Sequence, residues 1–125
     1  MTQSSRRYDL ENRTTVFGGE IIVFCKSIKR DTITNPIINQ IIKSGTSIGA
    51  NYAEANNASS KKDFTNKVFI CKKESQETKY WLKMLAKCCP ERKKELLELW
   101  KECQELTMIF QKITNSLRKK LKIEN

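Results

Sequence analysis

The chain has 125 residues, and its 24 lysines and arginines outnumber its 14 aspartates and glutamates, which gives a formal net charge of +10 at pH 7. That length fits one domain with one core. The sequence contains no histidine, which excludes imidazole metal ligands and every catalytic pair that relies on histidine.

The N-terminal residues and the cysteines predict a cytoplasmic protein. Residues 1–13 are polar and lack the apolar stretch of a signal peptide. The longest apolar run, residues 21–25, is too short to span a membrane. The five cysteines are an odd number, which favours free thiols packed on helix faces in a reducing compartment. A zinc site would need four cysteines from distant positions, so we predict no metal and no other cofactor.

The first predicted helix covers about residues 15–30. Its apolar residues recur at steps of four, three and four, which places them on one helix face: Phe17, Ile21, Phe24 and Ile28. Two adjacent glycines, Gly18 and Gly19, cost such a helix roughly 1 kcal/mol each relative to alanine. They therefore suggest a bend or a close contact with another backbone.

The second predicted helix covers about residues 36–56. It begins where Asn35 can cap the helix and Pro36 suits the first turn. Its apolar stripe contains Ile38, Ile41, Ile48 and Tyr52. Gly45 and Gly49 are four residues apart on the same side, a spacing that permits close approach of a neighbouring helix.

Two longer helices are predicted over about residues 60–89 and 91–121, separated by Pro90. Ser60 and Asp63 resemble a capping box at the start of the first. Both carry a stripe with a seven-residue repeat: Phe64, Val68, Cys71, Ser75, Thr78, Leu82, Leu85 and Cys89, then Leu96, Leu99, Cys103, Leu106, Phe110, Ile113 and Leu117. Because short connections favour antiparallel neighbours, we predict an all-α, up-down-up-down four-helix bundle that forms a single domain over the whole chain.

The two long helices carry more apolar residues than one core stripe requires. The additional residues lie to the side of the stripes: Ile70, Trp81, Met84, Leu97, Trp100 and Met108. A bundle helix that touches two neighbours needs a wide apolar face. A subunit interface is also enriched in aromatic residues and methionine. Both interpretations stay open, and the second makes these six residues candidates for the interface of a homo-oligomer.

The positive charge is concentrated in the second half of the chain. Residues 61–125 carry 17 basic and 9 acidic side chains, whereas residues 1–60 carry 7 and 5. Such an excess either serves solubility or binds phosphates through counterion release. A membrane surface is a weaker interpretation, because the apolar residues are spaced for a bundle core. The candidates for phosphate contact are Lys61, Lys62, Lys72, Lys79, Lys83, Lys112, Arg118, Lys119, Lys120 and Lys122.

No motif in the sequence indicates an enzyme. We find no phosphate-binding loop, no dinucleotide-binding glycine motif and no nucleophile elbow. Glu54, Glu74 and Glu77 are carboxylates that an interior could hold, but a di-iron bundle also requires histidines. We therefore predict a protein without catalytic residues.

The middle of the chain resembles a known bacterial family. The similar segments are Ser44–Ala55, Lys61–Phe64 and Glu77–Leu82. They resemble the four-helix-bundle proteins encoded by intervening sequences in 23S ribosomal RNA genes, also called S23 ribosomal proteins, and the likeness covers about residues 8–118. This chain has Gly49 where many members have proline, and residues 55–58 replace the Gly-aromatic-Gly-Arg turn of many members.

The resemblance implies a small antiparallel bundle that assembles into a ring-like homopentamer. It also implies kinship with the accessory variability protein of diversity-generating retroelements, which works beside a reverse transcriptase and its template RNA. Two functions follow as hypotheses. One is non-catalytic binding of nucleic acid, RNA or DNA, through backbone phosphates by an oligomeric bundle. The other is a protein-interaction adaptor, such as a reverse-transcriptase accessory subunit.

Overall fold

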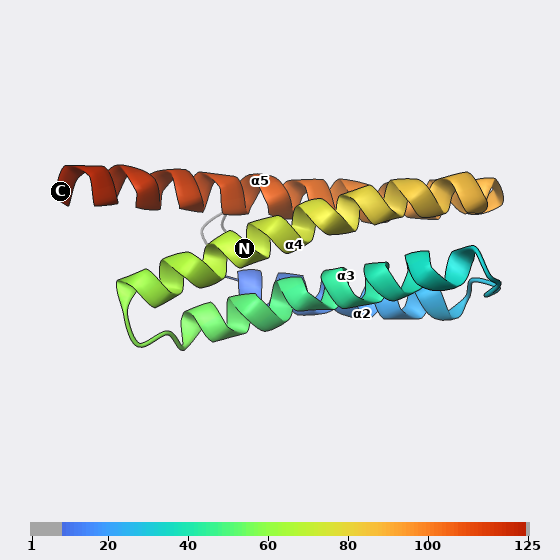
Figure 1. Ribbon diagram of the computed structural model, residues 1–125, viewed down its shortest axis with the longest axis horizontal. Helices are drawn as coiled ribbons and strands as arrows, with labels where there is room; N and C mark the ends of the chain where they lie inside the picture. Colours follow the sequence, from blue (N-terminus) through green and yellow to red (C-terminus); the bar gives the residue numbers. More distant parts are fainter. Residues whose placement is uncertain (1–8, 125) are drawn as a thin grey trace.

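The computed structural model describes residues 9–124, and the side chains of residues 9–120. Four α-helices make up most of this part of the chain: α2 (Leu10–Lys26), α3 (Thr34–Asn56), α4 (Lys61–Cys88) and α5 (Lys93–Glu124), with a short 3₁₀ turn, η1 (Pro90–Arg92), before α5. Each helix packs against the next in sequence, and α5 also contacts α2 (Figure 1). The described residues contain no strand, and the all-α antiparallel four-helix bundle is confirmed.

The first helix begins and ends earlier than the expected residues 15–30. Leu10 is only 1% exposed, and the buried Thr14 hydroxyl donates a hydrogen bond to the Leu10 carbonyl at 2.8 Å. Burial of these two residues accounts for the start of α2 at Leu10. At the other end α2 finishes at Lys26, and Ile28 is buried from the following turn instead of from the helix.

The beginning of α3 is capped by Asp31 and not by Asn35. The Asp31 carboxylate accepts hydrogen bonds from the backbone N–H groups of Ile33 and Thr34 at 2.9 and 2.8 Å, and the Thr34 hydroxyl accepts one from the Asp31 N–H. The backbone N–H donors at Thr34 and Ile33 hold the pKa of Asp31 below its usual value. Pro36 lies in the first turn of α3, as predicted.

The cap predicted at the start of the third helix is confirmed, whereas the start of the fourth differs. The Ser60 hydroxyl accepts a hydrogen bond from the Asp63 N–H at 3.0 Å. Pro90 begins the 3₁₀ turn, so α5 starts at Lys93 and not at residue 91. The long helix then continues to Glu124, three residues beyond the expected end.

Two polar contacts cross the core between the helices. The hydroxyls of Thr78 on α4 and Ser44 on α3 are hydrogen-bonded at 2.9 Å, and those of Thr107 on α5 and Ser75 on α4 at 3.0 Å. All four side chains are buried. The polar positions of the α4 stripe therefore face the core as the seven-residue repeat predicted, and they link α4 to both of its neighbours.

Candidate nucleic-acid interface

The outer surface of the α4–α5 pair carries basic side chains from both helices. Lys79 on α4 donates a hydrogen bond to the Gln104 side chain on α5, and its Nζ lies 5.6 Å from the centre of the Trp100 ring. The Nζ of Lys83 lies 5.4 Å from the same ring. Both lysines therefore lie over the seam between the two helices, where the indole ring stabilises their charge.

A second contact between a cation and an aromatic ring joins the two helices further along, with the cation on α5 and the ring on α4. The Arg118 guanidinium of α5 lies 4.9 Å from the centre of the Phe69 ring of α4. Lys112 and Lys119 are exposed on the side of α5 opposite the buried Phe110 and Thr114. We call the cations of the seam and of the outer side of α5 together the basic face; they are Lys72, Lys79 and Lys83 on α4 with Lys112, Arg118 and Lys119 on α5.

Four described carboxylates of α5 lie along the part of the helix that contacts α2. Arg13 on α2 binds Glu102 at 2.7 Å and Glu105 at 2.6 Å, and Glu95 and Glu98 line the groove between α2 and α5. The hydrogen bond from Arg13 is the main reason why the pKa of Glu102 is lowered. Arg13 therefore holds Glu102 and Glu105 toward α2, although Glu105 lies two helical turns before Lys112 and so on the same side of α5 as that lysine.

The carboxylates of α4 are turned toward α3. Lys67 binds Glu54 of α3 at 2.7 Å, which fixes the side of α4 that contacts α3. Glu74 lies two helical turns after Lys67 on the same side. Burial raises the pKa of Glu74, the nearby Glu77 raises it further, and Lys43 of α3 lowers it. Glu74 thus lies away from the α4 lysines of the basic face, whereas Glu105 lies on the same side of α5 as Lys112.

None of the predicted phosphate-contact residues whose side chains the structure describes forms an ion pair there. Salt bridges within the described residues use Arg13, Lys67 and Arg92 as their cations. Seven of the nine described candidates are exposed, and Lys72 and Lys79 are half-buried. Lys122 belongs to α5, but its side chain lies outside the described residues. Within the described residues, the charge of these side chains is therefore not neutralised by ion pairs.

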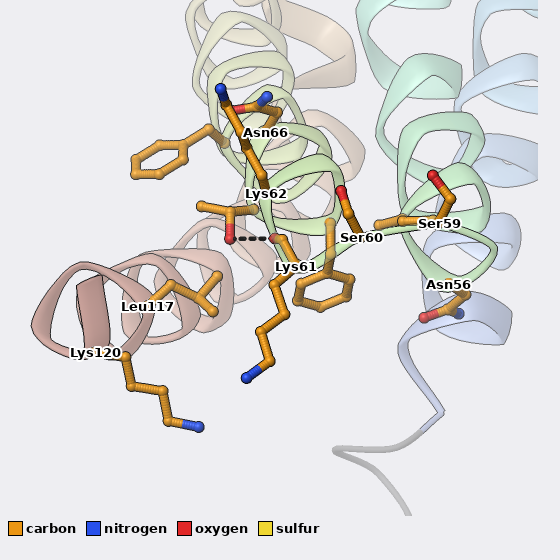
Figure 2. Close-up of a pocket in the computed structure, with 13 residues that line it drawn as sticks. Asn56, Ser59, Ser60, Lys61, Lys62, Asn66, Leu117 and Lys120 are labelled. Carbon is orange, nitrogen blue, oxygen red and sulfur yellow. Dashed lines mark hydrogen bonds between the residues drawn. The ribbon is translucent and has the colours of Figure 1, made fainter. Parts of the chain in front are cut away.

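The structure does not bring all the predicted basic residues onto one face. Lys61, Lys62 and Lys120 line a separate hollow of about 900 Å³, which we call the end pocket. It is bounded by the end of α3, the start of α4 and the end of α5. Figure 2 shows Lys61 on α4 and Lys120 on α5 with their ammonium groups on the same side of the pocket.

The six predicted interface residues also separate into different environments. Met84, Leu97 and Trp100 line one groove of about 640 Å³ between α4 and α5. Leu97 and Met108 are 47% and 53% exposed. Ile70 is half-buried, and Trp81 packs against the core, as does Trp100. The two tryptophans therefore belong to a wide apolar face that packs against the core. Leu97, in the groove, and Met108 are the exposed apolar residues of the set.

Sequence analysis missed an apolar surface on α2. Val16, Ile22 and Val23 are 50%, 42% and 71% exposed. Val16 and Val23 line a groove of about 680 Å³ between α2 and α5. The signal was present in the sequence, because these residues lie off the stripe that contains Phe17 and Ile21. The sequence analysis did not predict that Ile22 and Val23, within the apolar run at residues 21–25, are exposed.

Three buried cysteines are thiols with little nucleophilic character. Burial raises the pKa of Cys25 to about 11 and those of Cys71 and Cys103 to about 12. These three thiols are therefore protonated at neutral pH. In the part of the chain that the structure describes, no three side chains of histidine, cysteine, aspartate or glutamate gather as metal ligands. No helix within that part is long and apolar enough to cross a membrane.

The fold and the surface together define a basic, all-α four-helix bundle. Residues 8–112 match the family described as 23S rRNA-intervening sequence protein, and the chain belongs to this family. A similar solved structure is a protein of unknown function from the S23 ribosomal protein family of Bacteroides thetaiotaomicron. It is 30% identical, with a TM-score of 0.74 over 83% of this chain and 96% of that one. No curated protein matches the chain.

Proposed function

We propose that this protein is a non-catalytic nucleic-acid-binding protein that contacts backbone phosphates with its basic face. The observation that supports the proposal is the separation of charge across the α4–α5 pair. Four exposed and two half-buried cations line this pair of helices, while ion pairs hold Glu102 and Glu105 toward α2 and Glu74 lies on the side of α4 that faces α3. Such a surface attracts a polyanion and releases the counterions that surround it.

Lysine dominates the basic face, which favours binding without strong sequence preference. Five of its six cations are lysines, whose ammonium groups act as point charges. Phosphate contacts position a protein on nucleic acid but carry no direct sequence information. The affinity is therefore expected to depend steeply on salt and weakly on sequence.

The proposal includes assembly into a homo-oligomer, for which the family resemblance suggests a pentamer. The support in this chain is the exposed apolar surface of α2, which includes the 71% exposed Val23, because exposed apolar patches often mark interaction sites. An oligomer presents several basic faces to one strand, and the linked contacts raise the overall affinity. A cytoplasmic location also belongs to the proposal, in keeping with five cysteines that are free thiols.

The test is binding of labelled RNA and DNA duplexes, measured by fluorescence anisotropy between about 50 and about 200 mM salt. The double variant Lys112→Gln/Lys119→Gln removes two exposed cations from the basic face. The matched control, Lys26→Gln/Lys43→Gln, removes two exposed cations from α2 and α3. We expect the first variant to weaken binding and to reduce the salt slope by about 0.9 for each phosphate that the protein no longer neutralises.

The control variant should bind as the wild type does. Absence of binding to both duplexes at low salt, or an equal loss of affinity in the two double variants, would contradict the proposal. Light scattering that returns a mass of 14.6 kDa at working concentration would contradict the oligomer.

A protein-interaction adaptor, such as an accessory subunit of a reverse transcriptase, is the second candidate. Its support is the groove lined by Met84, Leu97 and Trp100, which is apolar and partly open. The gene neighbourhood distinguishes the two candidates. A retroelement cassette beside the gene favours the adaptor, and a position inside a ribosomal RNA gene favours the intervening-sequence class.

A further inference from the structure

The end pocket differs from the basic face because it combines cations with aromatic rings. Phe64 and Phe69 line it together with Leu117, and three lysines stand around them. Its volume of about 900 Å³ lies within the range of roughly 300–1,000 Å³ that is usual for sites that enclose small ligands. The pocket is therefore large enough to enclose a nucleotide.

The pocket lies where the two basic helices separate. Figure 1 shows α4 diverging from α5 toward the beginning of α4, and the end pocket occupies this region. Arg118 lies on the Phe69 ring at 4.9 Å, so one residue of the basic face touches a residue of the pocket wall. A strand bound along the basic face would reach the pocket without leaving the positive surface.

The aromatic wall decides which nucleic acid suits the pocket. In a duplex the bases are already stacked on one another, so a duplex needs only the cations of a protein surface. An unpaired base has an open face, and stacking on an aromatic side chain stabilises its binding whatever its identity. The exposed side chains of Ser59 and Asn66 also line the pocket. They are available to the polar edge of a base or to a sugar hydroxyl.

We infer that the end pocket binds an unpaired nucleotide of a strand whose phosphate backbone continues along the basic face. This inference rests on the proposed function and adds a ligand class to it. Lys61 and Lys120, whose ammonium groups lie on the same side of the pocket, would hold the phosphates that flank the base. Phe64 and Phe69 would supply the stacking surface.

The test compares single-stranded and blunt duplex probes of equal length, as RNA and as DNA, by fluorescence anisotropy. Phe69→Leu keeps an apolar side chain but removes the ring, and Phe64→Leu does the same at the inner wall. Tyr80→Leu is the matched control, because Tyr80 is an aromatic residue of α4 that is 54% exposed and lies outside the pocket. Thermal unfolding by circular dichroism checks that each variant is folded, and Phe69→Leu decides alone if Phe64→Leu unfolds.

We expect Phe69→Leu to weaken single-strand binding by about fivefold or more, the lower end of what removal of one stacked base costs. Its duplex affinity should fall much less than its single-strand affinity, because only the ring beneath Arg118 is lost, and its salt slope should stay unchanged, since no cation is removed. A probe with 2-aminopurine at an unpaired position should change fluorescence with the wild type and not with this variant.

Four results would overturn the inference. In the first, Phe69→Leu weakens both probes equally, and in the second it weakens neither; both leave the proposed function intact if the duplex still binds. In the third, the wild type binds no nucleic acid at low salt, and the proposed function fails as well. A decrease in affinity as large in Tyr80→Leu would place the stacking surface outside the pocket.

Discussion

Two glycines of this bundle are predicted to respond in opposite directions when they are replaced by alanine. Gly45 lies on α3 against α2, and a Cβ atom added there would be 3.1 and 3.2 Å from the Cγ1 and Cγ2 atoms of Ile21. Ile21 is fully buried, so its side chain has no free space to move into. Gly19 lies on the exposed side of α2, and a Cβ atom there would have no neighbour within 4 Å.

The magnitudes follow from two competing effects. Alanine is more favourable than glycine inside a helix by about 1 kcal/mol, and both sites are helical. Overpacking a close-packed core costs typically about 1–3 kcal/mol. Gly19→Ala should therefore increase the free energy of unfolding by about 1 kcal/mol. Gly45→Ala should lower it by up to about 2 kcal/mol, because the steric cost exceeds the helix gain.

The assay is urea unfolding followed by circular dichroism, with the transition midpoint and slope compared at one protein concentration. The slope should be unchanged in both variants, so that the midpoint reports stability. If Gly45→Ala were stabilised as much as Gly19→Ala, α2 and α3 would not approach as closely as the structure places them. The reasoning about close helix contact at Gly45 would then be refuted.

Three further predictions concern the ion pair, the core and the thiols. Because Arg13 lowers the pKa of Glu102 below its ordinary value of 4.5, their pairing stabilises the fold above that value and is lost as the pH falls through the lowered pKa. Arg13→Met should therefore lose less stability than the wild type between about pH 5 and about pH 3 in acid unfolding, and identical pH profiles would contradict this. The Ser44→Ala/Thr78→Val double variant should lose less free energy of unfolding than the sum of the losses in the two single variants, with a coupling of about 1 kcal/mol in a double-mutant cycle. Strict additivity would argue against the hydrogen bond. Cys88 is half-buried whereas the other four cysteines are buried, so it should be the first thiol to react with Ellman's reagent in the native protein. Cys88→Ser should abolish this fast phase. A fast phase that persists would show that a buried thiol is accessible.

Local patterns in the sequence predicted much of the bundle. The seven-residue repeat placed Ser75 and Thr78 on the buried side of α4 despite their polarity, and both are fully buried. The hydroxyl of Ser60 caps α4 as its distance from Asp63 along the chain predicted. These features depend on residues within a turn or two of each other, and helix geometry relates such neighbours directly.

Start and end points of helices were predicted less well where distant contacts decide them. Leu10 lies in a charged segment with no apolar repeat, and its burial in the core cluster extends α2 to include it. Asn35 is a good capping residue by type, but the turn before α3 brings Asp31 into that role. Residue type gives a preference at such positions, and the path of the loop selects among the candidates.

The amino-acid sequence by itself determined that this protein is a helical bundle with an excess of positive charge in its second half. Only the tertiary structure divided that charge into the basic face and the end pocket, and directed Glu102 and Glu105 of α5 toward Arg13. The physical reason is that periodicity tells which side chains share one side of a helix, but not which neighbouring helix covers that side. Lys79 and Lys120 have different surroundings because α4 and α5 pack together near Lys79 and diverge near Lys120.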